Sequence, residues 1–269
     1  HTLYGALTSS PAADWPKGSM RSIVEWDTNK PLGEIEQVEH TYAVMGNMNE
    51  HQLTVVESTW GGRPELVDTT GIIDYGSLMQ LALQRARTAR EAITVMTDLV
   101  KKYGYYSSGE SFSIADPEEV WILEMIGKGS ASKGAVWVAV RIPDDCIAAH
   151  ANHSRIHRFP LDDPENCLYS PDVISFAREQ KYFAGLNRDF SFSAAYAPAG
   201  FEELRACEAR VWSFYNRYDS TMVSYLPYIY GESSTPLPLY IKPDRKLSVQ
   251  DMNCLLYTSP SPRDPKTSR

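Results

Sequence analysis

The chain has 269 residues, of which 43% are hydrophobic and 22% are charged, as is ordinary for a globular protein with a sizeable apolar core. Its formal net charge of -8 argues against a nucleic-acid partner, because a phosphate backbone requires a basic face. No run of about 18 apolar residues is present, so the sequence predicts no membrane-spanning helix.

The four cysteines form no recognisable site. Cys146, Cys167, Cys207 and Cys254 lie at long and unrelated spacings, and there is no CxxC motif. Neither a zinc ribbon nor a redox motif is therefore indicated, while a disulfide stays open. Cysteine usage leaves the compartment undecided between the cytoplasm and, if a signal peptide precedes the chain, the periplasm or the exterior.

The first predicted elements are strands. A strand-like run covers residues 22–26, and two further runs, at residues 41–45 and 53–57, are joined by a polar, Asn-containing turn that is typical of a β-hairpin. The second of these runs continues into Trp60-Gly61-Gly62. Glycines at a strand end let the backbone approach another group closely, often a ligand, so this point is a candidate binding site.

A helical pattern follows. Between residues 75 and 102 apolar side chains recur with a 3.6-residue period, arginines occupy the other face, and Gly104 stands where a helix stop is expected. This pattern predicts one long helix or two helices in tandem.

Residues 110–151 are typical of an antiparallel meander, with strands expected at 111–114, 120–126, 135–142 and 146–151. Two of these strands are apolar on both faces, which indicates a sheet that is covered on both sides. Helices are expected at 171–180 and 201–218. This order of elements favours an α+β fold in which helices are layered on a sheet.

The end of the chain differs from the rest in composition. Residues 254–269 are rich in Ser, Pro and Arg, which is typical of a disordered tail. We interpret them as a non-native extension, expect them to pack against nothing, and assign the folded domain to residues 1–253.

Three histidines form the most prominent polar cluster. The spacings of His150, His153 and His157 are compatible with a zinc site on a helix, but the stretch follows a strand and has no neighbouring Asp or Glu and no HExxH motif. The alternative is that His150 packs in a strand while His153 and His157 are exposed in a loop. Cys207 lies inside a predicted helix and is expected to be an inert core thiol. The residues alone therefore identify no nucleophile.

Seven segments carry a family resemblance. They read GNMNEHQLTVVESTWGGR, DYGSLMQLALQRARTAREAI, KYGYYSSGESFSIADPEEVWILEMIGKG, KGAVWVAVRIPDDCIAAHANHSRI, NCLYSPDVISFARE, CEARVWSFYNR and PLYIKPDRKLSVQD. Together they resemble the cysteine dipeptidases of the dipeptidase A family, which are N-terminal-nucleophile (Ntn) hydrolases. The resemblance runs from His1 to about Asn253.

The resemblance implies a fold and a mechanism. The fold is a four-layer αββα sandwich, and the nucleophile is a cysteine at the mature N-terminus whose own α-amine, with a pKa of about 8, takes the thiol proton. In relatives this cysteine and its strand precede the segment that matches His1-Thr2-Leu3-Tyr4-Gly5. We therefore expect the sandwich to be incomplete, the first strand and the nucleophile to lie upstream, and the 269 residues alone to be inactive. A dipeptide or short peptide is the implied partner, and no cofactor or metal is implied.

The same resemblance carries over supporting catalytic residues. Asn152 matches an asparagine that donates to the oxyanion or orients the α-amine, and Thr59 matches a second oxyanion contributor that acts through its backbone N–H. Arg210 matches an arginine that stabilises the thiolate. The alternative for Arg210 is a salt bridge on a helix surface.

A second set of residues is expected to line the substrate pocket. It consists of Asn49, Glu50, Trp60, Gly61, Gly62 and Arg63. The first two match a turn that shapes the pocket, and Arg63 is a candidate partner for a dipeptide carboxylate.

Other functions stay open beside the dipeptidase. They are a related amidase or acylase acting on another small amide, a non-catalytic domain that keeps the scaffold, and a zinc hydrolase built on the histidines. The dipeptidase hypothesis makes a geometric prediction: Asn152, Thr59 and Arg210 converge on a gap or an exposed edge of the sheet, and the Trp60-Gly61-Gly62 backbone borders the same cavity. The sequence predicts no oligomeric state.

Overall fold

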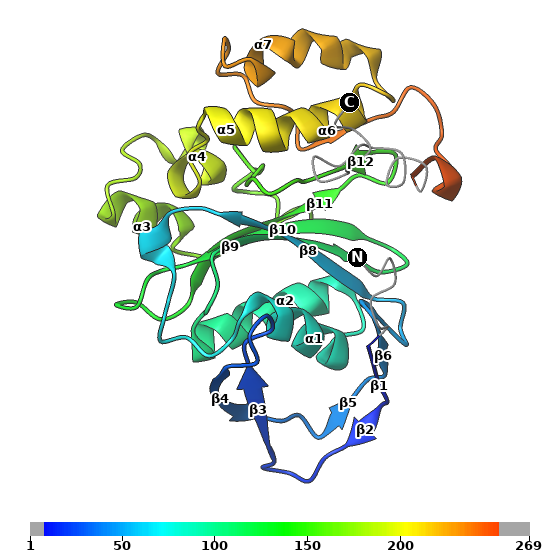
Figure 1. Ribbon diagram of the computed structural model, residues 1–269, viewed down its shortest axis with the longest axis vertical. Coiled ribbons are helices and arrows are strands. Elements are labelled where there is room, and N and C mark those ends of the chain that lie inside the picture. Colours follow the sequence, from blue (N-terminus) through cyan, green and yellow to red (C-terminus); the bar gives the residue numbers. More distant parts are fainter. Residues whose placement is uncertain (1–7, 253–269) are drawn as a thin grey trace, which may run out of the picture.

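An eight-stranded antiparallel sheet forms the centre of the molecule (Figure 1). The structure is a computed structural model and describes residues 8–252, so the predicted tail at residues 254–269 lies outside it. In spatial order the strands are β1 (Ser9–Ser10), β6 (Val44–Met45), β7 (Met48–Asn49), β8 (Thr54–Gly61), β9 (Gly109–Ala115), β10 (Val120–Gly127), β11 (Ala135–Ile142) and β13 (Cys167–Tyr169).

Helices lie on both faces of this sheet, which makes the architecture α+β. One face carries α1 (Tyr75–Arg85) and α2 (Ala89–Tyr103) (Figure 1). The other side carries α3 (Val173–Glu179), α4 (Phe192–Tyr196), α5 (Phe201–Glu203), α6 (Ala209–Tyr215) and α7 (Leu226–Ile229). Within residues 8–252, no helix has the length and apolar character needed to cross a lipid bilayer.

Shorter elements connect these layers. The 3₁₀ turns are η1 (Pro64–Leu66), η2 (Asn187–Asp189) and η4 (Ser220–Tyr225), and η3 (Leu204–Glu208) is a π-helical segment between α5 and α6. The two-stranded sheets pair β12 (Ile147–Ala148) with β14 (Tyr240–Ile241), β2 (Ala13–Asp14) with β5 (His40–Thr41), and β3 (Met20–Val24) with β4 (Pro31–Glu36). The expected helix at 201–218 is thus present but contains a π turn, a feature that is frequent at functional sites.

The predicted helical stretch at 75–102 is two helices in tandem. Asp74 caps the first by accepting a hydrogen bond from the Ser77 backbone N–H, and Thr88 caps the second by accepting from that of Glu91. Each cap satisfies one of the free N–H groups of a first turn. Gly104, with a φ of 79°, follows α2 as the sequence indicated.

Strand β10 shows why the meander is apolar on both faces. Trp121, Leu123 and Met125 pack into the core between the sheet and α1–α2, whereas Ile122 and Ile126 pack into the core on the opposite face. Each fully buried side chain of this size contributes about 1.5–3 kcal/mol of hydrophobic free energy. The prediction of a sheet covered on both sides is confirmed.

The N-terminal hairpin differs from its prediction. The run at 41–45 is divided between β5 and β6, while the run at 53–57 extends to Gly61 as β8. Strand β7 pairs with β8 at a single position, Met48 opposite Thr54. The prediction missed β1, β2, β7 and β14 because strands of two residues carry no alternation to read. It also missed β4 and β13, and the strand expected at 146–151 is β12, which pairs with β14 and not with the meander.

Candidate active site

One edge of β8 is open beyond its contact with β7. The Val55 N–H donates to the Asn47 carbonyl at 3.0 Å, and the Asn47 side-chain amide donates to the Val55 carbonyl at 2.9 Å. Both backbone groups of a strand residue face the same neighbour, and the direction repeats every second residue. The backbone groups of Glu57 and Thr59 therefore face this edge, where no strand among residues 8–252 is paired with them.

A loop after β12 reaches the open edge at Asn152. The Asn152 backbone N–H donates to Ser58 Oγ at 2.9 Å, and its side-chain Nδ2 donates to the Thr59 carbonyl at 2.7 Å. Asn152 has a φ of 51°, a left-handed conformation that asparagine adopts more readily than most residues. The loop is thus fixed to the strand by both the backbone and the side chain of one residue.

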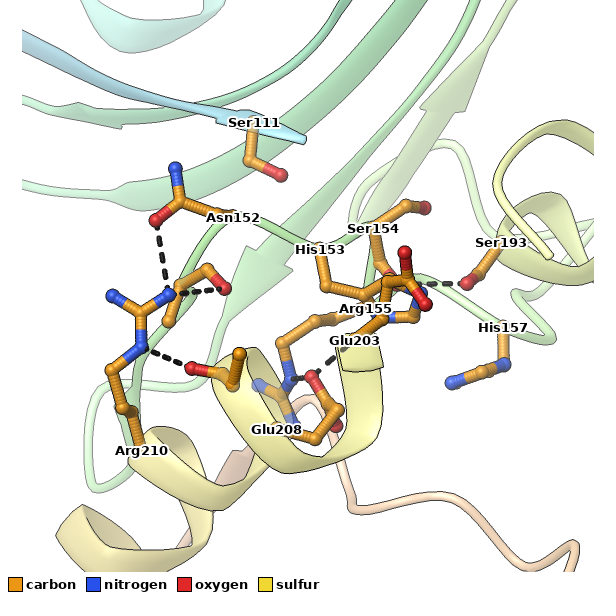
Figure 2. A network of polar contacts seen from close by, with 12 residues as sticks. Ser111, Asn152, His153, Ser154, Arg155, His157, Ser193, Glu203, Glu208 and Arg210 are labelled. Carbon is orange, nitrogen blue, oxygen red and sulfur yellow. Dashed lines mark hydrogen bonds and ion pairs between the residues drawn. The ribbon is translucent and has the colours of Figure 1, made fainter. Parts of the chain in front are cut away.

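Arg210, on α6, completes the group from a third segment. Its Nη2 donates to Asn152 Oδ1 at 3.0 Å and to the Ala151 carbonyl at 3.2 Å, while its Nε donates to the Ala206 carbonyl at 2.6 Å (Figure 2). The structure therefore brings Asn152, Thr59 and Arg210 together at an open strand edge. Arg210 has no acidic partner within ion-pair distance in the described chain, so the salt-bridge alternative gains no support.

Arg155 anchors this loop from behind. It is 1% exposed, and its Nε donates to Glu208 Oε1 at 3.1 Å. Its Nη groups donate to the carbonyls of Ala149 at 2.6 Å and Pro238 at 2.7 Å. Burial by itself would raise the pKa of Glu208, but the charge of Arg155, together with the hydrogen bond and charges of the neighbouring His153 and His157, outweighs burial and lowers that pKa. This buried pair joins the loop to the π-helical segment that precedes Arg210.

The sequence reasoning missed Arg155 and Glu208. A buried ion pair leaves no periodic pattern in a loop, and its only signal here was that Arg155 follows Asn152 closely. Figure 2 shows both residues beside His153, whose Nδ1 is 3.7 Å from Glu208 Oε1.

The histidines do not behave as a loop-exposed cluster. His153 is 2% exposed, so the expectation that it lies in solvent is wrong: it packs against the buried ion pair. His157 is half-buried rather than exposed, and burial lowers its pKa to about 4. Burial also lowers the pKa of His150 to about 4, and its Nε2 lies 2.8 Å from Ser113 Oγ. Among residues 8–252 no group of three or more His, Cys, Asp or Glu side chains is arranged to hold a metal, so the zinc alternative has no support.

The Trp60-Gly61-Gly62 stretch packs into the core. Trp60 is 8% exposed and contacts Phe192 edge-to-face, with ring centroids 6.4 Å apart. Gly62 has a φ of 79°, and a Cβ there would lie 2.4 Å from the Trp60 ring and 2.7 Å from Ile126 Cδ1. The close approach that glycine permits here is to the protein's own core.

Arg63 is held by neighbouring backbone and by an aromatic ring. Its Nε donates to the Ala195 carbonyl at 2.7 Å, and its guanidinium carbon lies 3.8 Å from the centroid of the Tyr182 ring. Glu65 Oε1 is 3.9 Å from its Nη1. Binding of a substrate carboxylate by Arg63 stays a prediction.

Asn49 and Glu50 serve the turn between β7 and β8. Asn49 Nδ2 donates to the carbonyls of Leu83 and Ala86, both at 2.8 Å, and its Oδ1 accepts from the backbone N–H groups of His51 and Leu53. Glu50 Oε1 accepts from the Ala43 N–H at 3.1 Å. Neither side chain shares a hydrogen bond with Asn152, Thr59 or Arg210 in the described chain.

Two cavities lie on opposite sides of the sheet. One, of about 990 Å³, lies between the segments 155–160 and 234–240. The other, of about 370 Å³, is lined by Thr59 and Glu110 on the side of α1. Trp60, Gly61 and Gly62 line neither, so the expectation that their backbone borders the cavity at Thr59 is not met there.

Glu110 gives the smaller cavity its chemistry. The side chain is 1% exposed, and Thr59 Oγ1 donates to its Oε1 at 2.8 Å. Burial raises the pKa of Glu110 to about 9, and the nearby Glu57 carboxylate adds to this, while the Thr59 hydrogen bond opposes it. Such a carboxyl keeps its proton at neutral pH.

The sequence is similar to known peptidases over most of its length. The profile of peptidase family C69 matches residues 1–261. A probable dipeptidase of Salmonella dublin is 26% identical over 231 residues, which cover 79% of this chain and 50% of that protein. A probable dipeptidase of Latilactobacillus sakei is 30% identical over 180 residues, covering 67% and 35%, respectively. The probable dipeptidase A of Streptococcus pyogenes serotype M3 is 28% identical over 183 residues, covering 66% and 36%. The chain thus spans no more than about half the length of these relatives.

Proposed function

Because the chain belongs to peptidase family C69, we propose that it is part of a dipeptidase that hydrolyses short peptides through an N-terminal cysteine. The names of its relatives, probable dipeptidases of three bacteria, support the reaction class. The cysteine is proposed to precede His1, as the resemblance to the dipeptidase A family implies. No cofactor takes part in the proposed reaction.

One observation carries this proposal: Asn152 bridges the β8 backbone and Arg210. Its amide donates to Thr59 and accepts from Arg210 at 2.7 and 3.0 Å, so three segments far apart in sequence meet at an open strand edge. A strand added along this edge would pair with the free backbone groups of Glu57 and with the Thr59 N–H, since the Thr59 carbonyl already accepts from Asn152. A nucleophile at the start of such a strand would lie among these three residues.

The proposed roles follow from the donors that remain available. Asn152 Nδ2 has a second N–H beside the one that it gives to Thr59, and it can donate to an oxyanion or to the α-amine of the nucleophile. The Thr59 N–H faces the same edge as its carbonyl and is the second oxyanion donor. The positive charge of Arg210 favours the thiolate over the thiol.

The reaction then proceeds in two steps. The cysteine thiol passes its proton to its own α-amine, and the sulfur attacks the peptide carbonyl to form a C–S bond and an oxyanion. Collapse of the oxyanion breaks the C–N bond, and the α-ammonium returns the proton to the leaving amine. Water then hydrolyses the thioester and regenerates the thiol.

We extend the proposal to the fold. The β12–β14 pair lies between the main sheet and α5–α6, which is where a second sheet of a four-layer αββα sandwich belongs (Figure 1). The described residues 8–252 would belong to one domain of this type, completed by a strand upstream.

The test is hydrolysis of dipeptides by the protein with its native upstream segment. We expect Asn152→Gly to reduce kcat by about 10²–10³-fold, as removal of an oxyanion donor does, without loss of folding. Glycine suits the left-handed backbone at this position. Asn29→Gly is the matched control, because Asn29 is exposed in a loop with a φ of 59° and should change nothing.

Several outcomes would contradict the proposal. If the 269 residues alone hydrolyse dipeptides and Cys207→Ala abolishes this activity, the nucleophile is Cys207 and not an upstream cysteine. Hydrolysis of other small amides but not of dipeptides would favour the amidase alternative. Full activity of the Asn152→Gly variant would show that Asn152 has no part in catalysis.

A further inference from the structure

The charged residues that line the cavity beside Thr59, among those that the structure describes, are all acidic. Glu25, Asp27, Asp74 and Glu110 line it, and none of its lining residues is Lys, Arg or His. Tyr75, Tyr106 and Ser107 also line the cavity, and their hydroxyl groups can donate or accept hydrogen bonds. A cavity of this composition carries a negative potential and favours a cation.

Glu110 is the carboxyl in this cavity whose bonding is incomplete. Its Oε1 accepts from Thr59, but no donor in the described chain reaches Oε2, although the side chain is 1% exposed. By contrast, Asp74 is satisfied by the backbone N–H groups of Trp26 at 2.6 Å and Ser77 at 3.0 Å. A buried acceptor without a donor is rare and requires an explanation.

A second carboxylate stands next to Glu110. Thr59 Oγ1 is 2.8 Å from Glu110 Oε1 and 3.5 Å from Glu57 Oε2, so its hydroxyl lies between the two side chains. Two neighbouring carboxyls repel each other unless a proton or a cation lies between them. An ammonium group bound at the free Oε2 would take the place of the proton that Glu110 otherwise keeps at neutral pH.

The lining of the cavity suits a small organic cation better than a metal ion. A metal site requires several ligands around one point, and among residues 8–252 no three carboxylates or other metal-binding side chains are so grouped. An ammonium group needs one or two carboxylates together with hydroxyl acceptors, and these are what the cavity offers.

We propose that this cavity binds the free α-ammonium group of the peptide substrate, with Glu110 Oε2 as its principal acceptor. The inference rests on the proposed function, because it places the substrate beside the nucleophile. In a peptide the α-nitrogen lies about 2.5 Å from the carbonyl carbon of the same residue, given the lengths of the two bonds that join them. Thr59 links the two sites, since its backbone faces the catalytic edge and its hydroxyl holds Glu110.

The arrangement predicts a preference for peptides whose amino end is free. A substrate whose amine is acylated has no charge to offer Glu110 and leaves a buried carboxyl without its partner. Rejection of such a substrate is strong when the site's own polar groups stay unpaired.

The experiment compares L-alanyl-L-alanine with N-acetyl-L-alanyl-L-alanine, using the protein with its native upstream segment. We expect the free dipeptide to be preferred, and Glu110→Gln to lower its kcat/KM about 10- to 100-fold, mainly through KM, as loss of a charged hydrogen bond does. The already slow cleavage of the acetylated peptide should not fall further. Glu118→Gln, an exposed carboxyl in a turn away from the cavity, is the matched control and should change neither substrate.

Equal cleavage of the two peptides by the wild-type protein, or an unchanged kcat/KM in a folded Glu110→Gln variant, would overturn the inference. If Glu110→Gln fails to fold, Asp27→Asn on the same cavity wall should raise KM for the free dipeptide alone, and an unchanged KM would count against the site.

A binding measurement separates this inference from the proposed function. If neither peptide is cleaved, the proposed function fails, and calorimetric titration with L-alanine methylamide and its N-acetyl form then decides the inference by itself. Binding of the cation alone, weakened by Glu110→Gln, supports it. Binding of neither compound, or of both equally, overturns it.

Discussion

Glu110 and Glu124 are buried glutamates on neighbouring strands, but they lie on opposite faces of the sheet and have opposite bonding. Glu124 is 0% exposed and accepts from Ser111 Oγ, Ser154 Oγ and the backbone N–H groups of Arg155 and Ile156. Glu110 is 1% exposed and accepts only from the Thr59 hydroxyl. Burial raises the pKa of both carboxyls, since desolvation disfavours their charged forms.

The difference distinguishes a structural carboxyl from one that is available to a ligand. Around Glu124, every donor comes from the chain itself, and the bonds hold the loop that carries Asn152. Around Glu110, an acceptor has been buried without its donor, which lowers stability. Groups of this kind concentrate at functional sites, where stability is exchanged for binding or catalysis.

The largest loss of stability is expected for Glu124→Gln. Each carboxylate oxygen accepts one backbone N–H, so the amide nitrogen of glutamine must face a donor. We expect the free energy of unfolding to fall by about 3 kcal/mol, as for a buried charged hydrogen bond that is broken. Chemical denaturation at pH 7 measures this, with Glu118→Gln as an exposed control. A loss below about 1 kcal/mol, the value of an ordinary hydrogen bond, would mean that the two glutamates do not differ as described.

Glu110→Gln is expected to act in the opposite direction. Above its ordinary pKa of 4.5 the unfolded chain releases this proton, whereas the folded chain retains it up to a pKa of about 9. The wild-type protein therefore loses stability as pH rises from 4.5 towards 9, and glutamine, which does not titrate, avoids this loss. The variant should be more stable by about 4–5 kcal/mol at pH 8, because each pH unit above 4.5 costs the wild type about 1.4 kcal/mol, and equal to the wild type at pH 4.

Denaturation curves of both proteins across this pH range would check the prediction. A Glu110→Gln variant that is less stable than the wild type at pH 8 would show that the carboxyl is already well paired in the folded protein. Glu110 would then belong with Glu124 as a structural residue.

The smallest effect concerns the two glycines that end β8. Both have positive φ, 73° at Gly61 and 79° at Gly62, but a Cβ at Gly61 meets nothing within 4 Å, while one at Gly62 meets the Trp60 ring. Gly61→Ala should therefore cost about 1 kcal/mol from backbone strain alone. Gly62→Ala should cost about 1–2 kcal/mol more, because the core must also shift. Equal decreases in Tm for the two variants would show that the Trp60 ring does not restrict the side chain at position 62.

The sequence predicted the regular parts of this molecule well. The helical period at 75–102 and the apolar strands of the meander correspond to α1, α2, β9, β10 and β11, because burial of a whole face repeats along the chain. It could not predict that His153 is buried, since that depends on the ion pair of Arg155 and Glu208, which are 53 residues apart.

The sequence by itself determined the class of fold, the helical stretch at 75–102 and, through the family resemblance, which residues to examine around a nucleophile. Only the tertiary structure decided that Asn152 bonds to both Thr59 and Arg210, and that Gly62 serves core packing. It also decided which of two buried glutamates lacks a donor. The physical reason is that periodic burial is a local property of the chain, whereas hydrogen-bond saturation depends on partners that only folding brings within about 3 Å.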